Sequence, residues 1–238
     1  MKKAQLILVR HGQSVYNLQN RFTGWTDVEL SRQGQTEARQ AGTLLKEHHI
    51  YPDICFTSWL KRAIHTANLA LEELQWEHID VYRSYKLNER HYGTWQGKDK
   101  NEIRAQEGDA NFLAVRRGYD VPPPPLDEND ERVVWREKKY ANIPHNMLPL
   151  SESLEDTRKR VVEYFQDKIQ TELQKHKRVL ISAHGNSLRA LVMYLEKISA
   201  EDIVKLEIPT GEIIVYTFDS LLNIEKKEIL TEKTKDTD

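Results

Sequence analysis

Short apolar runs alternate with longer segments of mixed polarity along most of this chain. Five runs predict strands: Gln5–Val9, Asp53–Thr57, Val81–Tyr82, Arg178–Ala183 and Ile213–Phe218. Four segments carry apolar residues at helical spacing: Ser31 to about His48, Leu60–Leu74, Ser153 to about Lys175, and Leu188–Leu195. Strands that alternate with helices are typical of a mainly parallel sheet covered on both faces. The pattern therefore predicts an α/β fold, a three-layer sandwich with a mostly parallel central sheet.

Two of the predicted helices begin at a capping signal. Ser31 is a good N-cap residue, because its hydroxyl can accept a hydrogen bond from a free backbone N–H of the first turn. Ser153 with Asp156 resembles a capping box, in which each side chain bonds the backbone of the other residue. Both helices are therefore expected to start at these serines.

The stretch from about Asp99 to Pro149 breaks the alternation. It holds the proline run Pro122–Pro125 and many charges, and its only helical signal is short. We expect residues 1–230 to form a single catalytic domain, with about 99–149 an excursion that makes a lid or a substrate-facing subdomain. The chain is polar from about Glu225 and shows no core pattern past Leu230, so residues 231–238 are predicted to be a mobile C-terminal tail.

Composition narrows the classes of partner. The chain has 238 residues, and its 35 basic and 37 acidic residues are well mixed, for a net charge of −2. This balance argues against nucleic acid, whose binders usually carry a basic excess on one face. No apolar run approaches the roughly 20 residues that span a bilayer, and the N-terminal run is too short for a signal peptide. The single cysteine, Cys55, suits a reducing compartment, so a cytoplasmic protein is expected, with Cys55 as a buried small hydrophobe.

Two histidines stand in the same local context. His11 and His184 each follow an apolar strand directly and each precede a glycine, in LILVRHG and VLISAHG. Ligands of a parallel α/β sheet bind beyond the carboxyl ends of its strands, so both histidines are expected at that edge. Gly12 and Gly185 would leave room for a ligand to approach the backbone. If the two strands are neighbours, both imidazoles reach one pocket.

Two arginines and a glutamate extend this constellation. Arg10 adjoins His11, and Arg62 lies just past the second strand; arginine is the natural bidentate partner of phosphate oxygens. Their charge should also oppose protonation of His11 and keep it nucleophilic. Glu89, in the loop LNERHYG, suits a general acid or base, although a lone loop glutamate is more often merely solvated. These residues predict phosphoryl transfer through His11.

The motif RHGQSVYN at Arg10–Asn17, together with AHGNS at Ala183–Ser187, resembles the histidine phosphatase superfamily, also called the phosphoglycerate mutase-like superfamily. Further segments are similar to one branch, the 2,3-bisphosphoglycerate-dependent phosphoglycerate mutases: Phe22–Gly34, Leu87–Gly93, Arg116–Pro125, Leu148–Thr157 and Ala183–Leu191. The similarity runs from about Gln5 to Phe218.

The resemblance implies a phosphoglycerate mutase-like fold and a role for each matching residue. His11 would be the phosphorylated nucleophile and Glu89 the proton donor and acceptor, while His184, Arg10 and Arg62 would bind the transferring phosphoryl group. Substrate phosphate and carboxylate would be held by Arg10, Asn17, Thr23, Gly24, Arg62, Glu89, Tyr92, Lys100, Arg116, Arg117, Gly185 and Asn186.

The implied reaction interconverts 2- and 3-phosphoglycerate, a step of glycolysis and gluconeogenesis, with 2,3-bisphosphoglycerate as priming phosphoryl donor and no metal. The partner is a small phosphorylated carboxylate, and a homodimer or homotetramer is expected by analogy. Two alternatives stay open: a phosphatase of the same fold that acts on a sugar phosphate or on bisphosphoglycerate, and a non-catalytic binding module. A metal-dependent hydrolase fits less well, because no carboxylate cluster accompanies the histidines.

Overall fold

The protein is built around one six-stranded sheet, and the computed structural model describes residues 3–175 and 177–231. The strands are β1 (Gln5–Arg10), β2 (Ile54–Thr57), β3 (Val81–Arg83), β4 (Arg178–Ala183), β5 (Ile213–Phe218) and β6 (Ile224–Ile229). Their spatial order is β3-β2-β4-β1-β5-β6, in which the first four run parallel and β5 and β6 run antiparallel to their neighbours. The predicted mostly parallel α/β sheet is confirmed.

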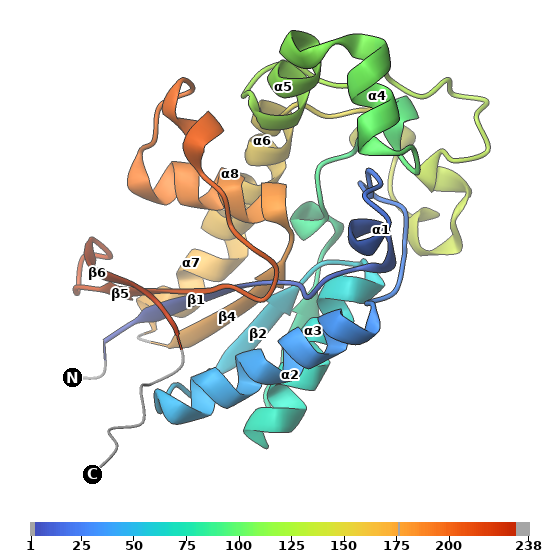
Figure 1. The fold of residues 1–238 in the computed structure, drawn as a ribbon. Coiled ribbons are helices and arrows are strands. Elements are labelled where there is room, and N and C mark those ends of the chain that lie inside the picture. Colours follow the sequence, from blue (N-terminus) through green and yellow to red (C-terminus); the bar gives the residue numbers. More distant parts are fainter. Residues whose placement is uncertain (1–2, 176, 232–238) are drawn as a thin grey trace.

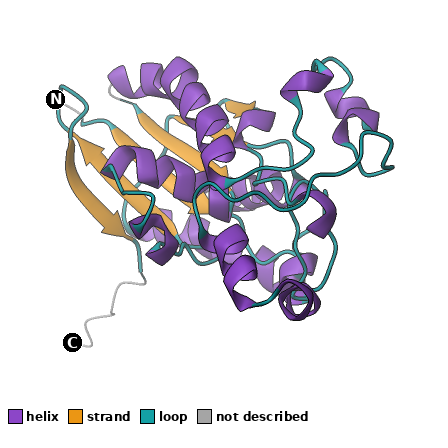
Figure 2. Cartoon of the chain, turned by 90° about the horizontal axis from the view of Figure 1, so that it is seen from above, coloured by secondary structure: helices purple, strands orange, loops and turns teal. Residues whose placement is uncertain are grey.

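Helices cover both faces of the sheet (Figures 1 and 2). The α-helices of the described chain are α1 (Val15–Leu18), α2 (Arg32–Glu47), α3 (Lys61–Leu74), α4 (Lys100–Glu107), α5 (Asp109–Arg117), α6 (Leu154–Tyr164), α7 (Gln170–Gln174) and α8 (Gly185–Glu196). Of these, α2 and α3 cover one face of the sheet, and α6, α7 and α8 cover the other. Successive strand residues point to opposite faces. Ile7 and Val9 therefore pack with α2 and α3, whereas Leu6 and Leu8 pack with α6, α7 and α8. Cys55 is fully buried in the α2–α3 layer, as predicted.

The capping signals place the helix starts. The Ser31 hydroxyl accepts a hydrogen bond from Gly34 N, and Ser153 and Asp156 form the predicted capping box. The predicted helix from Ser153 to about Lys175 is interrupted, because Phe165–Ile169 forms a π-helical turn between α6 and α7. The predicted helix Leu188–Leu195 begins earlier, at Gly185, and the N–H of His184 bonds the Ser187 hydroxyl. The N-terminus of α8 therefore lies directly at the end of β4.

The excursion holds α4, α5 and three 3-10 turns: Val134–Arg136, Lys138–Tyr140 and His145–Met147. None of the described strands lies within residues 99–149. Ile103 of α4 and Phe112 and Val115 of α5 pack on Phe22 and Trp95. This contact places α4 and α5 beyond the carboxyl ends of β1 and β4 (Figure 1).

The polar stretch from Glu225 to Leu230 belongs to the sheet, although its pattern predicts no strand. Residues Ile224–Ile229 form β6, which pairs with β5, and Leu230 is buried. The strand was missed because β6 is an edge strand whose side chains are almost all exposed, so no apolar alternation marks it. Apart from Thr231, the predicted tail lies outside the described residues. No helix among residues 3–175 and 177–231 is long and apolar enough to span a membrane.

Candidate active site

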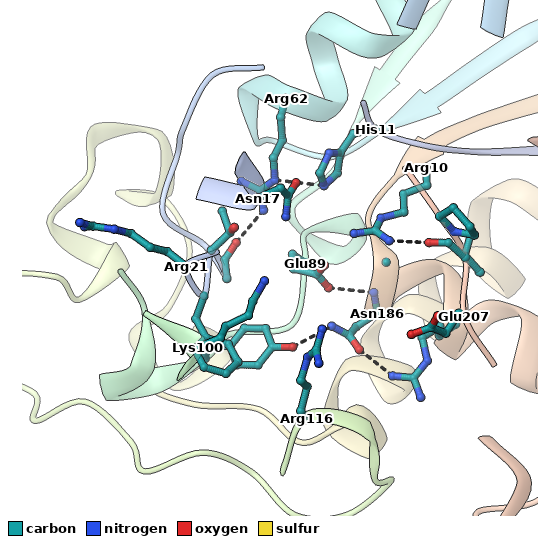
Figure 3. A pocket seen from close by; sticks show the side chains of 18 of the residues that line it. Arg10, His11, Asn17, Arg21, Arg62, Glu89, Lys100, Arg116, Asn186 and Glu207 are labelled. Atoms are coloured by element: carbon teal, nitrogen blue, oxygen red, sulfur yellow. Dashed lines mark hydrogen bonds between the residues drawn. The ribbon is translucent and has the colours of Figure 1, made fainter. Parts of the chain in front are cut away.

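A cavity of about 270 Å³ opens beyond the carboxyl ends of β1 and β4, between the sheet and the excursion (Figure 3). All predicted site residues except His184 line it: Arg10, His11, Asn17, Thr23, Gly24, Arg62, Glu89, Tyr92, Lys100, Arg116, Arg117, Gly185 and Asn186. The chain therefore gathers into one place residues that are separated by up to 176 positions, from Arg10 to Asn186.

The two strand-end histidines lie against each other. β1 and β4 are parallel neighbours with Arg10 opposite Ala183, so His11 and His184 leave the sheet side by side. Their ring centroids are 5.0 Å apart and the rings are inclined at 63°. His184 is fully buried behind His11, and its Nε2 lies 2.8 Å from the hydroxyl of Ser58.

Hydrogen bonding defines the tautomer of His11. Its Nδ1 lies 2.7 Å from the carbonyl oxygen of Gly12, which can only accept, so the ring proton resides on Nδ1. The lone pair therefore resides on Nε2, which accepts a 3.3 Å hydrogen bond from Nε of Arg62. Burial, followed by the charges of Arg62 and Arg10, holds the pKa of His11 well below its usual range. The residue is a neutral imidazole with its nucleophilic nitrogen presented to the cation-lined cavity.

Arg62 is held by the backbone of the loop that precedes α2. It lies in the first turn of α3, is fully buried, and donates to the carbonyls of Thr26 (3.0 Å) and Gly24 (2.7 Å). Burial lowers its pKa to about 10, so it stays charged at neutral pH. Gly24 has φ +54°, and a Cβ there would meet the Gln96 side chain at 2.1 Å. Only glycine lets this carbonyl reach the guanidinium without displacing that side chain.

Two buried nitrogens near the histidines lack partners among the described residues: Arg10 Nε and His184 Nδ1. The NH1 group of Arg10 donates to the carbonyl of Ile208 at 2.5 Å, which aims the guanidinium at the cavity. Burial, then Arg62 and His11, holds the pKa of His184 well below its usual range. An unpaired buried donor such as Arg10 Nε is costly, and an anionic ligand in the cavity would satisfy it.

Glu89 lies in the cavity wall with one oxygen engaged. Its Oε1 accepts two hydrogen bonds from backbone N–H groups. One comes from Arg90 (2.8 Å), and the other comes from Asn186 in the first turn of α8 (3.0 Å; Figure 3). Free N–H groups at a helix N-terminus favour a carboxylate. Among the described residues no group donates to its Oε2, which leaves this oxygen for a ligand.

The far wall is a network around Tyr92. Its hydroxyl accepts from Arg90 NH2 (2.8 Å) and from the Asn186 side-chain amide (3.2 Å). The Asn186 oxygen in turn accepts from NH1 of Arg189 (2.9 Å), whose NH2 donates to the carbonyls of Arg117 and Ile203. The side chains of Tyr92 and Asn186 are therefore held in place by hydrogen bonds before a ligand binds.

Positive charge dominates the cavity. Its basic residues are Arg10, Arg21, Arg62, Lys100, Arg116, Arg117 and Arg189, whereas Glu89 and Glu207 are its only acids in the described part of the chain. Burial, then the charge of Arg116, lowers the pKa values of Lys100 and Arg117. Glu207 forms an ion pair with Arg117. Such a cavity suits a ligand with more than one anionic group.

Six lining residues were not predicted: Arg21, Phe22, Arg189, Glu207, Ile208 and Pro209. Arg189 and Phe22 lie inside motifs that had been noted, so their place in those motifs was the available signal. The segment Glu207–Pro209 reaches the cavity because Arg10 holds Ile208, and the sequence carries no signal for that contact. No cluster of three or more metal-ligating side chains occurs among residues 3–175 and 177–231.

Comparisons with known proteins agree on one family. The model of the histidine phosphatase superfamily (branch 1) matches residues 6–222. The chain is 49% identical over 228 residues to the 2,3-bisphosphoglycerate-dependent phosphoglycerate mutase of Hydrogenobaculum sp. (strain Y04AAS1), covering 96% of this chain and 92% of the relative. It is 46% identical to the protein of the same name from Treponema denticola, covering 97% of this chain and 94% of the relative.

Solved structures share the fold at lower identity. One mycobacterial hydrolase superposes with a TM-score of 0.70 at 23% identity, covering 96% of this chain and 97% of that chain. Mycobacterial glucosyl-3-phosphoglycerate phosphatase also superposes with a TM-score of 0.70, at 24% identity, covering 98% of this chain and all of that chain. At this identity the likeness speaks for the architecture.

Proposed function

This chain belongs to the histidine phosphatase superfamily, and we propose that it interconverts 2- and 3-phosphoglycerate through a phosphohistidine at His11. The priming donor would be 2,3-bisphosphoglycerate, as the names of its relatives state for them. The observation that carries the proposal is the neutral His11, whose Nε2 meets Arg62 at the wall of a cavity lined with basic side chains.

In the first step, Nε2 of His11 attacks phosphorus while the bond from phosphorus to the leaving oxygen breaks. The leaving alkoxide takes a proton from Glu89. In each turnover, the free hydroxyl of a bound phosphoglycerate attacks the phosphohistidine, the bond from phosphorus to Nε2 breaks, and Glu89 takes the hydroxyl proton, so 2,3-bisphosphoglycerate forms in the cavity. This intermediate reorients and returns its other phosphoryl group to His11, and Glu89 protonates the oxygen that leaves. Arg10, Arg62 and His184 would stabilise the charge on the transferring oxygens, so the protein mainly positions groups and neutralises charge.

The rest of the cavity favours a mutase over a phosphatase. Lys100, Arg116 and Arg117 come from the excursion and line the same cavity as His11. A phosphatase needs one phosphate site, whereas a mutase must retain a second anionic group while its intermediate reorients. We propose that α4 and α5 are the substrate-facing part of the predicted excursion and hold that group with these three cations.

The remaining binding roles follow from position. Asn17 lines the cavity from α1, and Thr23 and Gly24 line it from the segment that anchors Arg62, so all three would contact the transferring phosphoryl group. Tyr92, Gly185 and Asn186 lie beside Glu89 and would contact the glycerate. Arginines supply the positive charge in this scheme, which therefore needs no metal, and a reaction of glycolysis and gluconeogenesis would place the protein in the cytoplasm.

Mass analysis of the intact protein after incubation with 2,3-bisphosphoglycerate tests the proposal. We expect one acid-labile phosphoryl adduct, unchanged by EDTA, and its absence in His11→Asn, which cannot form a phosphoramidate. Turnover of 3-phosphoglycerate should require the bisphosphate primer. An adduct that persists in His11→Asn, or activity that is lost on chelation and restored by a divalent metal, would refute the mechanism.

A further inference from the structure

The loop that carries Glu89 is held by one arginine on the neighbouring helix α6. Arg160 lies on α6, and its NH1 donates to the carbonyls of Lys86 and Asn88, both at 2.9 Å. Its NH2 donates to the carbonyl of Glu89 itself, also at 2.9 Å. The loop segment from Asn88 to Tyr92 belongs to no helix or strand. The hydrogen bonds from Arg160 therefore satisfy backbone carbonyls that a helix or strand would otherwise pair.

Glu152 completes the arrangement from the opposite side. Its carboxylate binds Arg160 through two parallel bonds, Nε to Oε1 at 2.6 Å and NH2 to Oε2 at 2.7 Å. The same Oε2 accepts from His91 N at 2.8 Å, and Glu152 N donates to the His91 carbonyl at 2.9 Å. The Glu152–Arg160 pair thus bonds the backbone on both sides of Glu89.

The pair is almost completely buried, with side-chain exposures of 5% for Glu152 and 12% for Arg160. A buried ion pair adds little stability unless further hydrogen bonds satisfy its remaining groups. Here those groups are satisfied by the Glu89 loop. Trp25 adds another donor, since its indole N–H bonds the Glu89 carbonyl at 2.5 Å and its ring lies 5.5 Å from the Arg160 guanidinium. Both lone pairs of that carbonyl are therefore engaged, and the direction of the Glu89 side chain is restricted.

We propose that Glu152 and Arg160 are positioning residues that set the place of the Glu89 carboxylate relative to His11. The inference rests on the proposed function, in which Glu89 exchanges a proton with the substrate oxygen. With its backbone held, Glu89 extends to Asn186 N and leaves Oε2 toward the ligand. Misplacing a catalytic group by about 1 Å can lower a rate by about 100-fold. A loosened pair should therefore slow only the steps that need the proton of Glu89.

The test uses Arg160→Lys and the milder Glu152→Gln, with Glu163→Gln as the matched control. Glu163 lies on the same helix α6 and pairs with Lys86 at the surface, at 2.7 Å. Rapid-quench phosphorylation of His11 is measured with two donors: 2,3-bisphosphoglycerate, whose alkoxide must be protonated as it leaves, and 4-nitrophenyl phosphate, whose nitrophenolate leaves without a proton.

We expect Arg160→Lys and Glu152→Gln to slow phosphorylation by bisphosphoglycerate by about 10- to 100-fold, with little change in its KM. Phosphorylation by 4-nitrophenyl phosphate should slow by less than about threefold, because a proton adds little to that step. The control should change neither. If a variant lowers the rate of His11 phosphorylation equally with both donors, the pair only supports folding and the proposal is overturned. This holds whether or not the KM changes.

Comparing the single and double variants at Arg160 and Glu89 tests the positioning role separately from the proposed proton transfer by Glu89. If Arg160 acts through Glu89, adding Arg160→Lys to Glu89→Gln should cause no further loss with bisphosphoglycerate. Additive losses would overturn the positioning role. If Glu89→Gln slows the reaction and neither pair variant does, the positioning role alone fails. If Glu89→Gln has no effect, the proposed proton transfer by Glu89 fails, and the positioning role fails with it.

Discussion

Replacing Arg62 by glutamine should raise the pKa of His11. Arg62 Nε lies 3.3 Å from His11 Nε2, and both side chains are buried. Two unit charges about 4 Å apart interact by about 4 kcal/mol at an effective dielectric constant of about 20. That corresponds to about 3 pKa units as an upper bound. Burial of His11, the largest cause of its lowered pKa, remains in the variant, so we expect a rise of about 1 to 3 units.

The assay is an NMR titration of the histidine ring signals in the ligand-free protein, so that no substrate group titrates. The His11 signal is assigned as the one missing in His11→Asn. Arg21→Gln is the control, because Arg21 also lines the cavity but does not contribute to the lowered pKa of His11. A His11 pKa that moves by less than about half a unit in Arg62→Gln, or equally in both variants, would show that burial alone keeps His11 neutral.

Two further variants test other parts of the site. Glu207→Gln should lower the KM for phosphoglycerate by about two- to fivefold at unchanged kcat, because Glu207 occupies Arg117 in the empty cavity; steady-state kinetics showing an equal or higher KM would contradict this. Burial, then Arg160 and Arg132, lowers the pKa of His91 from 6.5 to about 3. Between these values only the unfolded chain binds that proton, so stability falls as pH falls. In His91→Asn, whose oxygen can still accept from Gly93 N, denaturant unfolding should show a slope shallower by about 1.4 kcal/mol per pH unit, and an unchanged slope would refute the assignment.

Local patterns in the chain were sufficient to predict the architecture and to single out the two strand-end histidines that the structure brings together. Alternating apolar runs and amphipathic segments predict strands and helices one by one, because burial on a sheet or helix face imposes a period of two or 3.6 residues. His11 and His184 were recognisable because each directly follows such a strand. The carboxyl ends of parallel strands share one edge, so the pairing needed only that β1 and β4 be neighbours.

The resemblance to a known family, rather than the pattern, pointed to Glu89, Lys100 and the Arg116–Arg117 pair. A loop glutamate or a helix-end arginine has no periodicity that separates it from a solvated residue. Their shared cavity arises only when the excursion folds over the sheet.

Other features were decided by tertiary structure alone. β6 forms because its backbone pairs with β5. Its mostly exposed side chains show no apolar alternation that would have predicted this pairing. Glu207 reaches the cavity through a bond between Arg10 and the Ile208 carbonyl, across 198 positions. Arg160 binds backbone carbonyls more than 70 positions away. Every residue has such a carbonyl, so the sequence does not show which of them will accept the hydrogen bond. Side-chain periodicity is a local property that the chain displays in order, whereas hydrogen bonds to distant backbone groups depend on which segments the folded core brings together.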